Sequence, residues 1–377
     1  MPQNNYTSFR TFDYIIIGAG LAGLSLADSL VTKGCDIAVI DKKGIGGGAS
    51  GIPIGMADPA ASRNANLYWE TEKCYDTTLE NLNKLQEYSK KPFFKITGVL
   101  RPGITHKRGV SLERSFHRQD WPDGWCEWKT EEMIKEMSPE VYCVYGGLWH
   151  PNSIAVAIPE YLEAYHAYLK QQDVSSYIIE DYILKQQDNF WIIQNHDLEL
   201  VTKNIVFATG ADTLDISYWA KLPIHPVKGQ VAMFKVPDPL PFSFSLSGNG
   251  YIGRIEVQKF IVGSTYEHDF THREPDEYGR KYLTRKLKQS LPGIAEKAQI
   301  IGQWAEVRAS TPNRLPILGT HHSYPSLHII TGMGSKGLLY SKYTADLMAD
   351  YLLEGVPLKK EIDVERIYRR FRKQNLI

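Results

Sequence analysis

Apolar residues follow two patterns along the chain, and each predicts one kind of element. Apolar runs at 14–17 and 205–208, and one at 327–330 that is interrupted by His328, lead into glycine turns, as buried strands of a parallel sheet do. Elsewhere apolar residues recur every three or four positions, which predicts helices. The predicted helices cover 24–30, 66–91, 155–171, 276–291 and 338–354.

The middle of the chain has a different pattern. Between 176 and 262, short stretches rich in β-branched and aromatic residues alternate with polar, proline or glycine turns, which is typical of antiparallel strands. A further strand is expected at 93–100, whereas 101–150 has no clear period and is expected to be irregular. The pattern therefore predicts an α/β fold with an α+β part.

The strand at 14–17 opens a dinucleotide-binding unit. Its isoleucines run into Gly18-x-Gly20-x-x-Gly23, a helix follows, and a second strand ends in Asp41, about 18 residues beyond the last glycine. The glycines allow a tight turn, approach of the backbone to a pyrophosphate, and close packing of helix on strand. The helix N-terminus offers N–H groups to phosphate, and Asp41 is placed to bind a ribose. This complete order favours a dinucleotide site over a plain structural βαβ unit.

Two further glycine-rich segments carry possible binding chemistry. Segment 44–56 has too much glycine for a helix interior or a central strand, so it is either a surface loop or a backbone that binds phosphate or a flavin edge. At 332–337 a strand again enters a glycine turn and then a helix. The spacing of this turn is not that of a second dinucleotide motif. We therefore expect it to serve the same cofactor as the first.

Composition narrows the class of protein. The 377 residues exceed one ordinary core and suggest two domains. The 43 basic residues equal the 43 acidic ones, so no global field recruits nucleic acid or an anionic membrane. The four cysteines form no C-x-x-C pair, which suggests neither a metal site nor a redox dithiol and fits a reducing compartment. A polar N-terminus and the lack of a long apolar run predict a cytoplasmic protein without signal peptide or transmembrane helix.

Taken in order, these pieces resemble the D-amino-acid oxidase superfamily of FAD-dependent oxidoreductases. Within it, they are most similar to the glycine oxidases and to the oxidase domains that modify the wobble uridine of tRNA. The resemblance covers nearly the whole chain, and its C-terminal motifs are more specific than the first glycine motif. The motifs that carry it are 18–23 with Asp41, 48–56, 208–210, 226–231, 307–319 and 332–337.

The resemblance implies a Rossmann-like FAD-binding domain from 1–90, 151–222 and 301–377, and an antiparallel-sheet substrate domain from 91–150 and 223–300. It implies non-covalent FAD, because the cysteines and the first histidine do not stand where relatives attach flavin. The implied cofactor-binding residues are Gly18, Gly20, Leu21, Ala22, Gly23, Asp41, Lys42, Ser50, Gly51, Gly55, Met56, Gly210, Gly334, Ser335, Lys336, Gly337 and Leu338. Among them, Asp41 and Lys42 would hold the adenosine end, and 334–338 would direct N–H groups at the flavin N1/O2 locus.

The resemblance also implies a substrate site. Arg308 matches the arginine that binds the substrate carboxylate in glycine oxidases, and a guanidinium suits that role because it pairs bidentately with a carboxylate. The alternative for Arg308 is a structural salt bridge. Tyr251 and Arg254 are expected to cover the pocket, with an ordinary buried or surface role as the alternative. Asn313 stands where the family usually carries an acid, which leaves the substrate range open.

The leading hypothesis is oxidation of the C–N bond of a small amine or amino acid, by hydride transfer to flavin N5 and hydrolysis of the imine. The flavin is the electron sink, so no dedicated general base is required. Oxygen is one acceptor for the electrons. One alternative is a dehydrogenase that passes them to a quinone. A nicotinamide dehydrogenase is another, but no second nucleotide fingerprint supports it.

A tRNA substrate is a further alternative, in which a carboxymethyl group is removed from the wobble uridine's amine. Basic residues at 106–118 and 366–372 favour it, although such clusters are more often solvated faces and the zero net charge argues against it.

Overall fold

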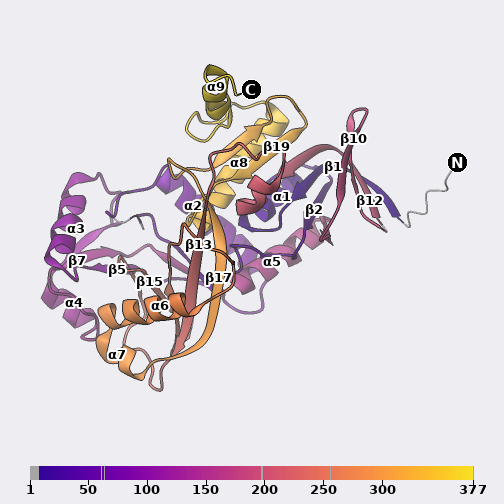
Figure 1. Ribbon diagram of the computed structural model, residues 1–377. Coiled ribbons are helices and arrows are strands. Elements are labelled where there is room, and N and C mark those ends of the chain that lie inside the picture. Colours follow the sequence, from indigo (N-terminus) through magenta and orange to yellow (C-terminus); the bar gives the residue numbers. More distant parts are fainter. Residues whose placement is uncertain (1–7, 61, 63, 197, 255, 377) are drawn as a thin grey trace.

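The computed structural model describes residues 8–376 apart from 61, 63, 197 and 255 (Figure 1). Two large sheets and one small sheet organise these residues. The first large sheet and its helices occupy the upper right of Figure 1, and the second lies below and to the left.

The first sheet has a parallel centre. Its order is β10-β11-β12-β1-β2-β9, and β19 pairs with β12 and β18. β1 runs parallel to β12 and β2, and β12 runs parallel to β19, as the glycine-ended apolar runs predicted. The strands are β1 (Ser8–Ile17), β2 (Ile37–Asp41), β9 (Ser175–Ile178), β10 (Ile183–Gln187), β11 (Phe190–Gln194), β12 (Leu198–Phe207), β18 (Ile317–Thr320) and β19 (Leu327–Thr331).

Helices cover both faces of this sheet. Leu26, Leu82, Tyr165 and Tyr340 come from four different helices and lie in one apolar core against it. These helices are α1 (Leu21–Thr32), α2 (Thr71–Gln86), α5 (Ile158–Gln171) and α8 (Gly337–Glu354). A second core covers the opposite face, under the 3₁₀ helix η1 (Gly210–Asp215) and α9 (Glu365–Lys373). The sheet is thus buried on both sides, as parallel sheets usually are.

The second sheet is largely antiparallel, in the order β17-β13-β16-β15-β14-β5-β7-β6. Its longest strands, β13 and β17, pair along their whole length and run side by side through the centre of Figure 1. The strands are β5 (Val99–Pro102), β6 (Glu127–Lys129), β7 (Gly147–His150), β13 (His225–Lys235), β14 (Ser245–Ser247), β15 (Tyr251–Arg254), β16 (Lys259–Gly263) and β17 (Gln299–Ser310).

Four helices flank the second sheet, and a small third sheet links it to the first. The helices are α3 (His106–Arg118), α4 (Glu131–Met137), α6 (Glu277–Ser290) and α7 (Pro292–Lys297). The small sheet has the order β3-β8-β4, formed by β3 (Ile54–Ala57), β8 (Ile154–Ala157) and β4 (Phe94–Ile96). Ile54 packs with Val231 and Ile261 of the second sheet, while Val156 packs in the core of the first. The predicted combination of an α/β and an antiparallel part is confirmed.

Several predicted elements have different limits. The helix expected at 66–91 is limited to α2, because residues before Thr71 form a loop in which Glu70 has φ +48°. The strand expected at 93–100 is two strands in different sheets, broken at Gly98 with φ +68°. The helix expected from Ala155 begins only at Ile158, because 154–157 form β8. The helix expected at 276–291 ends at Ser290, and α7 follows at once.

The segment 101–150, expected to be irregular, contains two helices and two strands. Threonine caps begin both helices: Thr105 accepts a hydrogen bond from the Arg108 N–H, and Thr130 accepts one from the Met133 N–H. Such caps satisfy N–H groups that have no partner inside the helix, so these threonines were the sequence signal that the period of apolar residues did not give.

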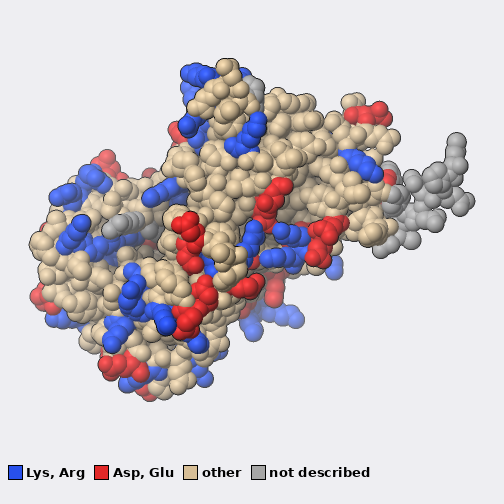
Figure 2. Space-filling model, in the orientation of Figure 1, with Lys and Arg blue, Asp and Glu red and all other residues tan. Residues whose placement is uncertain are grey.

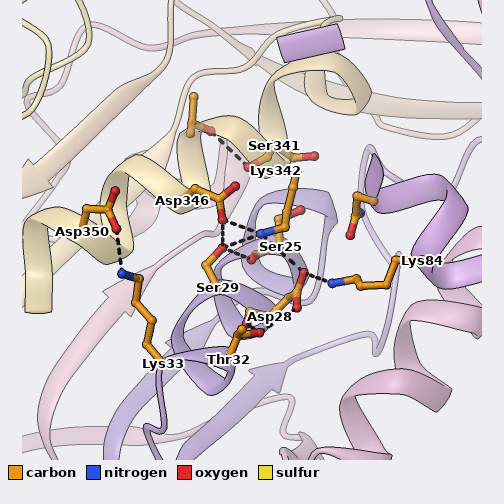
Figure 3. Close-up of polar contacts among 12 residues, drawn as sticks. Ser25, Asp28, Ser29, Thr32, Lys33, Lys84, Ser341, Lys342, Asp346 and Asp350 are labelled. Carbon is orange, nitrogen blue, oxygen red and sulfur yellow. Dashed lines mark hydrogen bonds and ion pairs between the residues drawn. The ribbon is translucent and has the colours of Figure 1, made fainter. Parts of the chain in front are cut away.

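A buried polar cluster joins α1 to α8 (Figure 3). The Asp28 carboxylate lies 2.7 Å from the Lys84 ammonium and 3.5 Å from that of Lys342, and only 1% of the Asp28 side chain is exposed. Ser29 donates a hydrogen bond of 2.7 Å to Asp346, which also pairs with Lys342. The cluster fixes how the two helices face each other, and both helices begin at predicted cofactor-binding turns.

Within the described part of the chain, no helix is long and apolar enough to cross a membrane.

Candidate active site

The turn between β1 and α1 has no room for side chains. Gly18 has φ +116°, and a Cβ there would lie 2.7 Å from the carbonyl carbon of Ala208. A Cβ on Gly23 would lie 3.0 Å from the carbonyl carbon of Gly18. Leu24 donates to the Gly20 carbonyl, so the N–H groups of Ala22 and Gly23 precede the hydrogen bonds of the helix. They are available to a phosphate at the positive end of α1.

Side chains from the next two segments hold this turn. Asp41, at the end of β2, accepts hydrogen bonds of 2.8 Å from the backbone N–H groups of Ala19 and Lys43, one on each carboxylate oxygen. Each oxygen keeps a lone pair, so Asp41 can still accept from ribose hydroxyls. The Ser50 hydroxyl accepts from the Leu21 N–H at 3.1 Å. The glycine-rich segment 44–56 is therefore tied to the nucleotide turn, and its Gly51 is exposed beside Ser50.

Lys42 follows Asp41 and pairs with η1, the 3₁₀ helix that begins at Gly210. The Lys42 ammonium is 2.6 Å from Asp212, which also receives a 2.6 Å hydrogen bond from Arg273. Burial favours a higher pKa for Asp212, but these two cations hold its pKa below the usual value. Gly210, with φ +56°, begins η1 directly after β12. Lys42 thus already has a protein partner, whereas a Cβ built on Gly210 would meet no other atom within 4 Å.

The C-terminal glycine turn meets the N-terminal one. A Cβ on Gly337, the first residue of α8, would lie 3.6 Å from Cδ1 of Leu21 at the start of α1. Gly55 of β3 also packs here, because a Cβ on it would lie 3.2 Å from Cδ2 of Leu338. Two helix N-termini, more than 300 residues apart in the sequence, therefore face one region. Gly334 has φ +57° and donates a 2.8 Å hydrogen bond to Ala309 of β17.

Arg308 lies next to that contact. Its Nη1 donates to the Ser264 hydroxyl at 3.1 Å, and its Nη2 donates to the Thr265 carbonyl at 2.7 Å. Its Cζ lies 4.3 Å from the centre of the Tyr266 ring. Its Nε is buried without a hydrogen-bond partner in the described structure, and its pairing contacts are neutral groups rather than a carboxylate. A guanidinium with an unused donor is suited to an anionic ligand.

The two other predicted substrate residues have different surroundings. The Tyr251 hydroxyl lies 3.5 Å from the Ile54 carbonyl, so Tyr251 reaches β3 beside Gly55. Burial raises the pKa of Tyr251, although the charge of Arg308 acts in the opposite direction, and the phenol stays protonated at neutral pH. Arg254 instead donates to the backbone carbonyls of Phe242 at 2.7 Å and Glu256 at 3.2 Å. These contacts favour a structural role for Arg254.

Sequence reasoning did not single out Tyr68 as a site residue. Its ring and that of Tyr340 each lie 4.7 Å from the Lys336 ammonium. Burial and the nearby Arg314 lower the pKa of Lys336 to about 8. Tyr68 therefore packs against the C-terminal glycine turn. This contact is not evident in the sequence, because the spacing of apolar residues over 66–91 places Tyr68 on a helix.

The remaining predicted residues are more peripheral. Met56 is half-buried in β3, where it pairs with Ala155 of β8, and Ser335 is exposed in the turn before α8. Asn313 accepts a hydrogen bond of 3.4 Å from the Leu315 N–H, so it shapes its own turn.

These residues fit FAD. The crowded glycine turn, the helix N–H groups and the carboxylate of Asp41 suit a dinucleotide, and the second helix N-terminus suits a part of the cofactor that becomes negative on reduction. FAD combines both features in one molecule.

The sequence profile of the DAO family, described as FAD dependent oxidoreductase, matches residues 13–351. The chain belongs to this family. FAD is accordingly its cofactor and the protein is an oxidoreductase, as the motifs predicted.

Relatives of known name are distant but cover most of the chain. The tRNA 5-methylaminomethyl-2-thiouridine biosynthesis bifunctional protein of Polaromonas sp. (strain JS666 / ATCC BAA-500) is 26% identical over 386 residues, which cover 92% of this chain. The chain spans only 58% of that relative's length. The glycine oxidase of Geobacillus kaustophilus (strain HTA426) is 22% identical over 350 residues, covering 90% of this chain and 92% of the relative.

Solved structures show the same fold. A crystal structure of glycine oxidase from Geobacillus kaustophilus matches with a TM-score of 0.81 and 20% identity, over 94% of this chain and 97% of that chain. A crystal structure of iminodiacetate oxidase from Chelativorans sp. BNC1 matches with a TM-score of 0.78 and 20% identity, over 94% and 98%.

Proposed function

We propose that this enzyme oxidises the C–N bond of a small amine or amino acid that carries a carboxylate. The observation that carries the proposal is Arg308, which holds an unpartnered, buried Nε beside the C-terminal glycine turn. The names glycine oxidase and iminodiacetate oxidase indicate substrates that carry both an amine and a carboxylate. The similarity to these two proteins supports the same class of substrate here.

The protein's part in this reaction is to bind and orient. Bound FAD would supply the acceptor for a hydride from the carbon next to the amine nitrogen. Arg308 would pair with the carboxylate and so fix that carbon. Tyr251 of β15, whose phenol stays protonated, would donate a hydrogen bond to the substrate. The resulting imine reacts with water to give a carbonyl compound and ammonia or a shorter amine. Oxygen or a quinone would then remove the electrons.

The test compares substrates with and without a carboxylate. Glycine and sarcosine, with methylamine and dimethylamine as carboxylate-free partners, are mixed anaerobically with the purified holoenzyme, and loss of the oxidised-flavin absorbance is followed. We expect bleaching by a carboxylated amine. Arg308→Ala should lower kcat/KM for it by at least about a hundredfold, since two charge-assisted hydrogen bonds are lost. Arg308→Lys should keep part of the rate.

Two results would contradict the proposal. A purified protein that neither contains nor binds FAD would end it entirely. A wider panel of amines that bleaches the flavin equally well with and without carboxylates would remove the role of Arg308 only. Hydrogen peroxide release under air would distinguish oxygen from a quinone as the acceptor.

A cytoplasmic location is consistent with the four free cysteines.

A tRNA substrate is the second candidate. The similarity to the bifunctional tRNA-modifying protein supports it, and Figure 2 shows Lys and Arg side chains gathered over α9, at the top of that view. Against it, Arg369 and Arg372 of this helix both pair with Glu365. Retention of tRNA that weakens steeply with salt would favour this candidate, and no retention at low salt would exclude it.

A further inference from the structure

The segment Lys228-Gly229-Gln230 lies at the middle of β13 and is unusually polar for a buried strand. Only 1% of Lys228 and none of Gln230 is exposed. The Lys228 ammonium is 2.8 Å from Asp276 and 3.8 Å from Glu267. Moving a charge out of water costs free energy. We therefore expect a buried lysine with two carboxylates to serve the fold or the chemistry. The amine chemistry proposed above does not use these residues directly.

The Gln230 amide uses all of its hydrogen-bonding capacity. Its Nε2 donates to Glu267 at 3.0 Å and to Asp276 at 2.8 Å. Its Oε1 accepts from the Asp276 N–H at 3.0 Å and from Gln303 at 2.9 Å. Gly279 at the start of α6 lies so close that a Cβ there would be 2.8 Å from Nε2. Only a side chain of this shape, with two donors and two acceptor sites, satisfies the position.

Lys228 and Gln230 also hold the segment Ser264–Glu267. The Lys228 N–H donates to the Glu267 carbonyl and the Glu267 N–H donates to the Lys228 carbonyl, both at 3.0 Å. The Gln230 N–H donates to the Thr265 hydroxyl at 2.8 Å, and the Thr265 N–H returns a bond of 3.1 Å to the Gln230 carbonyl. β13 and Ser264–Glu267 are thus locked together by both backbone and side chains.

Arg308 lies between these two elements. The Ser264 hydroxyl and the Thr265 carbonyl accept hydrogen bonds from its two terminal nitrogens, and the ring of Tyr266 covers its face. On the opposite side, a Cβ on Gly229 would lie 2.7 Å from Cζ and 3.1 Å from Nε of Arg308. The guanidinium therefore occupies a slot with one wall formed by Gly229 and the other by 264–266.

The charges around the slot balance. Lys228 and Arg308 supply two positive charges, and Glu267 and Asp276 supply two negative ones. Burial opposes ionisation of Asp276, but hydrogen bonds from Lys228 and Gln230 hold its pKa well below the usual value. Asp276 is therefore charged at neutral pH and pairs with Lys228, which leaves the Arg308 guanidinium free of a carboxylate partner.

We propose that Lys228, Gly229 and Gln230 are positioning residues, which fix the guanidinium of Arg308 and keep the nearby carboxylates away from it. The inference rests on the proposed function of Arg308. It assigns a task to the motif 226–231: the glycine makes room for the guanidinium, and the flanking lysine and glutamine engage the acids that would otherwise neutralise it. The motif thereby determines how tightly the site binds a carboxylate.

Binding of acetate to the holoenzyme by isothermal titration calorimetry tests this, with acetamide as the neutral probe of the same size. We expect Gly229→Ala and Lys228→Met to weaken acetate binding about tenfold or more, since at least one charge-assisted hydrogen bond to the ligand is misaligned. Lys228→Arg should restore most of the affinity. Lys235→Met, an exposed lysine at the end of the same strand, is the matched control and should bind acetate like the wild type.

Kinetics separate positioning from a merely structural role. For a carboxylated amine the variants should raise KM more than they lower kcat, whereas an amine without a carboxylate should be oxidised at an unchanged rate. If Lys228→Met fails to retain FAD, Gly229→Ala and Ser264→Ala, which leave the buried ions in place, carry the test. Ser264→Ala removes the acceptor of Nη1 and should weaken acetate severalfold.

The outcomes are distinguishable. If the wild type binds acetate and Arg308→Ala does not, but Gly229→Ala and Lys228→Met bind it normally, the positioning role is overturned and the proposed function stands. Equal losses for acetate and acetamide, or for both kinds of amine, would also overturn it, because they would reflect general damage. A wild type that binds no acetate and oxidises no carboxylated amine would overturn both.

Discussion

At the scale of single residues, the proposed substrate end of the site consists of Arg308 and the ring that covers it. Tyr266 is 62% exposed, although its ring centre lies 4.3 Å from Cζ of the guanidinium. An exposed cation–π contact is worth about 0.5–1 kcal/mol. Tyr266→Ala should therefore raise KM for a carboxylated amine about two- to fivefold, while Tyr266→Phe, which keeps the ring, should not. Steady-state kinetics check this, and equal effects of the two variants would show that the hydroxyl rather than the ring matters.

The sequence indicates the roles of some of these residues better than those of others. Arg308 could be predicted as a substrate-binding residue because it stands in a specific motif, and its role stays a prediction. Arg254 was expected beside it from its position on a strand, but sequence does not tell whether a guanidinium faces a cavity or backbone carbonyls, and here it donates to two carbonyls. The contact of Tyr68 with Lys336 depends on a loop path that no local pattern encodes.

At the scale of elements, the pairing of α1 with α8 depends on the buried cluster in Figure 3. Asp28→Asn would leave Lys84 without its carboxylate and Lys342 with Asp346 alone. Losing one partner of a fully buried ion pair costs about 3 kcal/mol or more, and the loss here should be about 1–2 kcal/mol because 36% of the Lys84 side chain is exposed. We expect this loss in the free energy of unfolding measured with urea at fixed FAD concentration. Asp350→Asn is the matched control, because its pair with Lys33 is largely solvated and should change stability far less. Similar effects of both variants would contradict a special role for the buried cluster.

The elements themselves were predictable where the apolar period was long. The parallel strands and α8 followed from apolar runs and glycines. The predicted limits were wrong where short elements meet. β8 passes into α5 without a turn, so the spacing of apolar residues over 155–171 predicts a single helix. The helices of 101–150 are polar, with 13 residues in α3 and 7 in α4, and their threonine caps are the local signal of where they begin.

At the scale of the whole molecule, the first sheet contains a pH-sensitive position. His328 in β19 is 5% exposed, and burial lowers its pKa from 6.5 to about 4. The unfolded chain therefore binds a proton at a higher pH than the folded one, so stability is complete above pH 6.5 and is lost as the pH falls towards 4. This group alone contributes about 3 kcal/mol to that loss. Urea unfolding across this window should show a steeper decline for the wild type than for His328→Gln, and parallel declines would assign acid sensitivity to other groups.

The overall architecture was predictable because a family resemblance supplied what local patterns cannot, the pairing of distant segments. The partition of the chain into cofactor and substrate domains at residues 90, 150, 222 and 300 remains a proposal. β17, which carries Arg308, pairs with β13 of the antiparallel sheet and yet touches Gly334 at the end of the parallel one.

The contact between Gly337 and Leu21 has a consequence for biosynthesis. The ribosome makes the nucleotide turn more than 300 residues before it makes the second helix N-terminus of the same site. Cofactor capture that uses both helix N-termini must therefore wait until the second one has left the ribosome. A premature stop before Gly332 should yield a protein without its flavin rather than a weakened enzyme, and supply of FAD during expression should govern how much newly made chain escapes degradation.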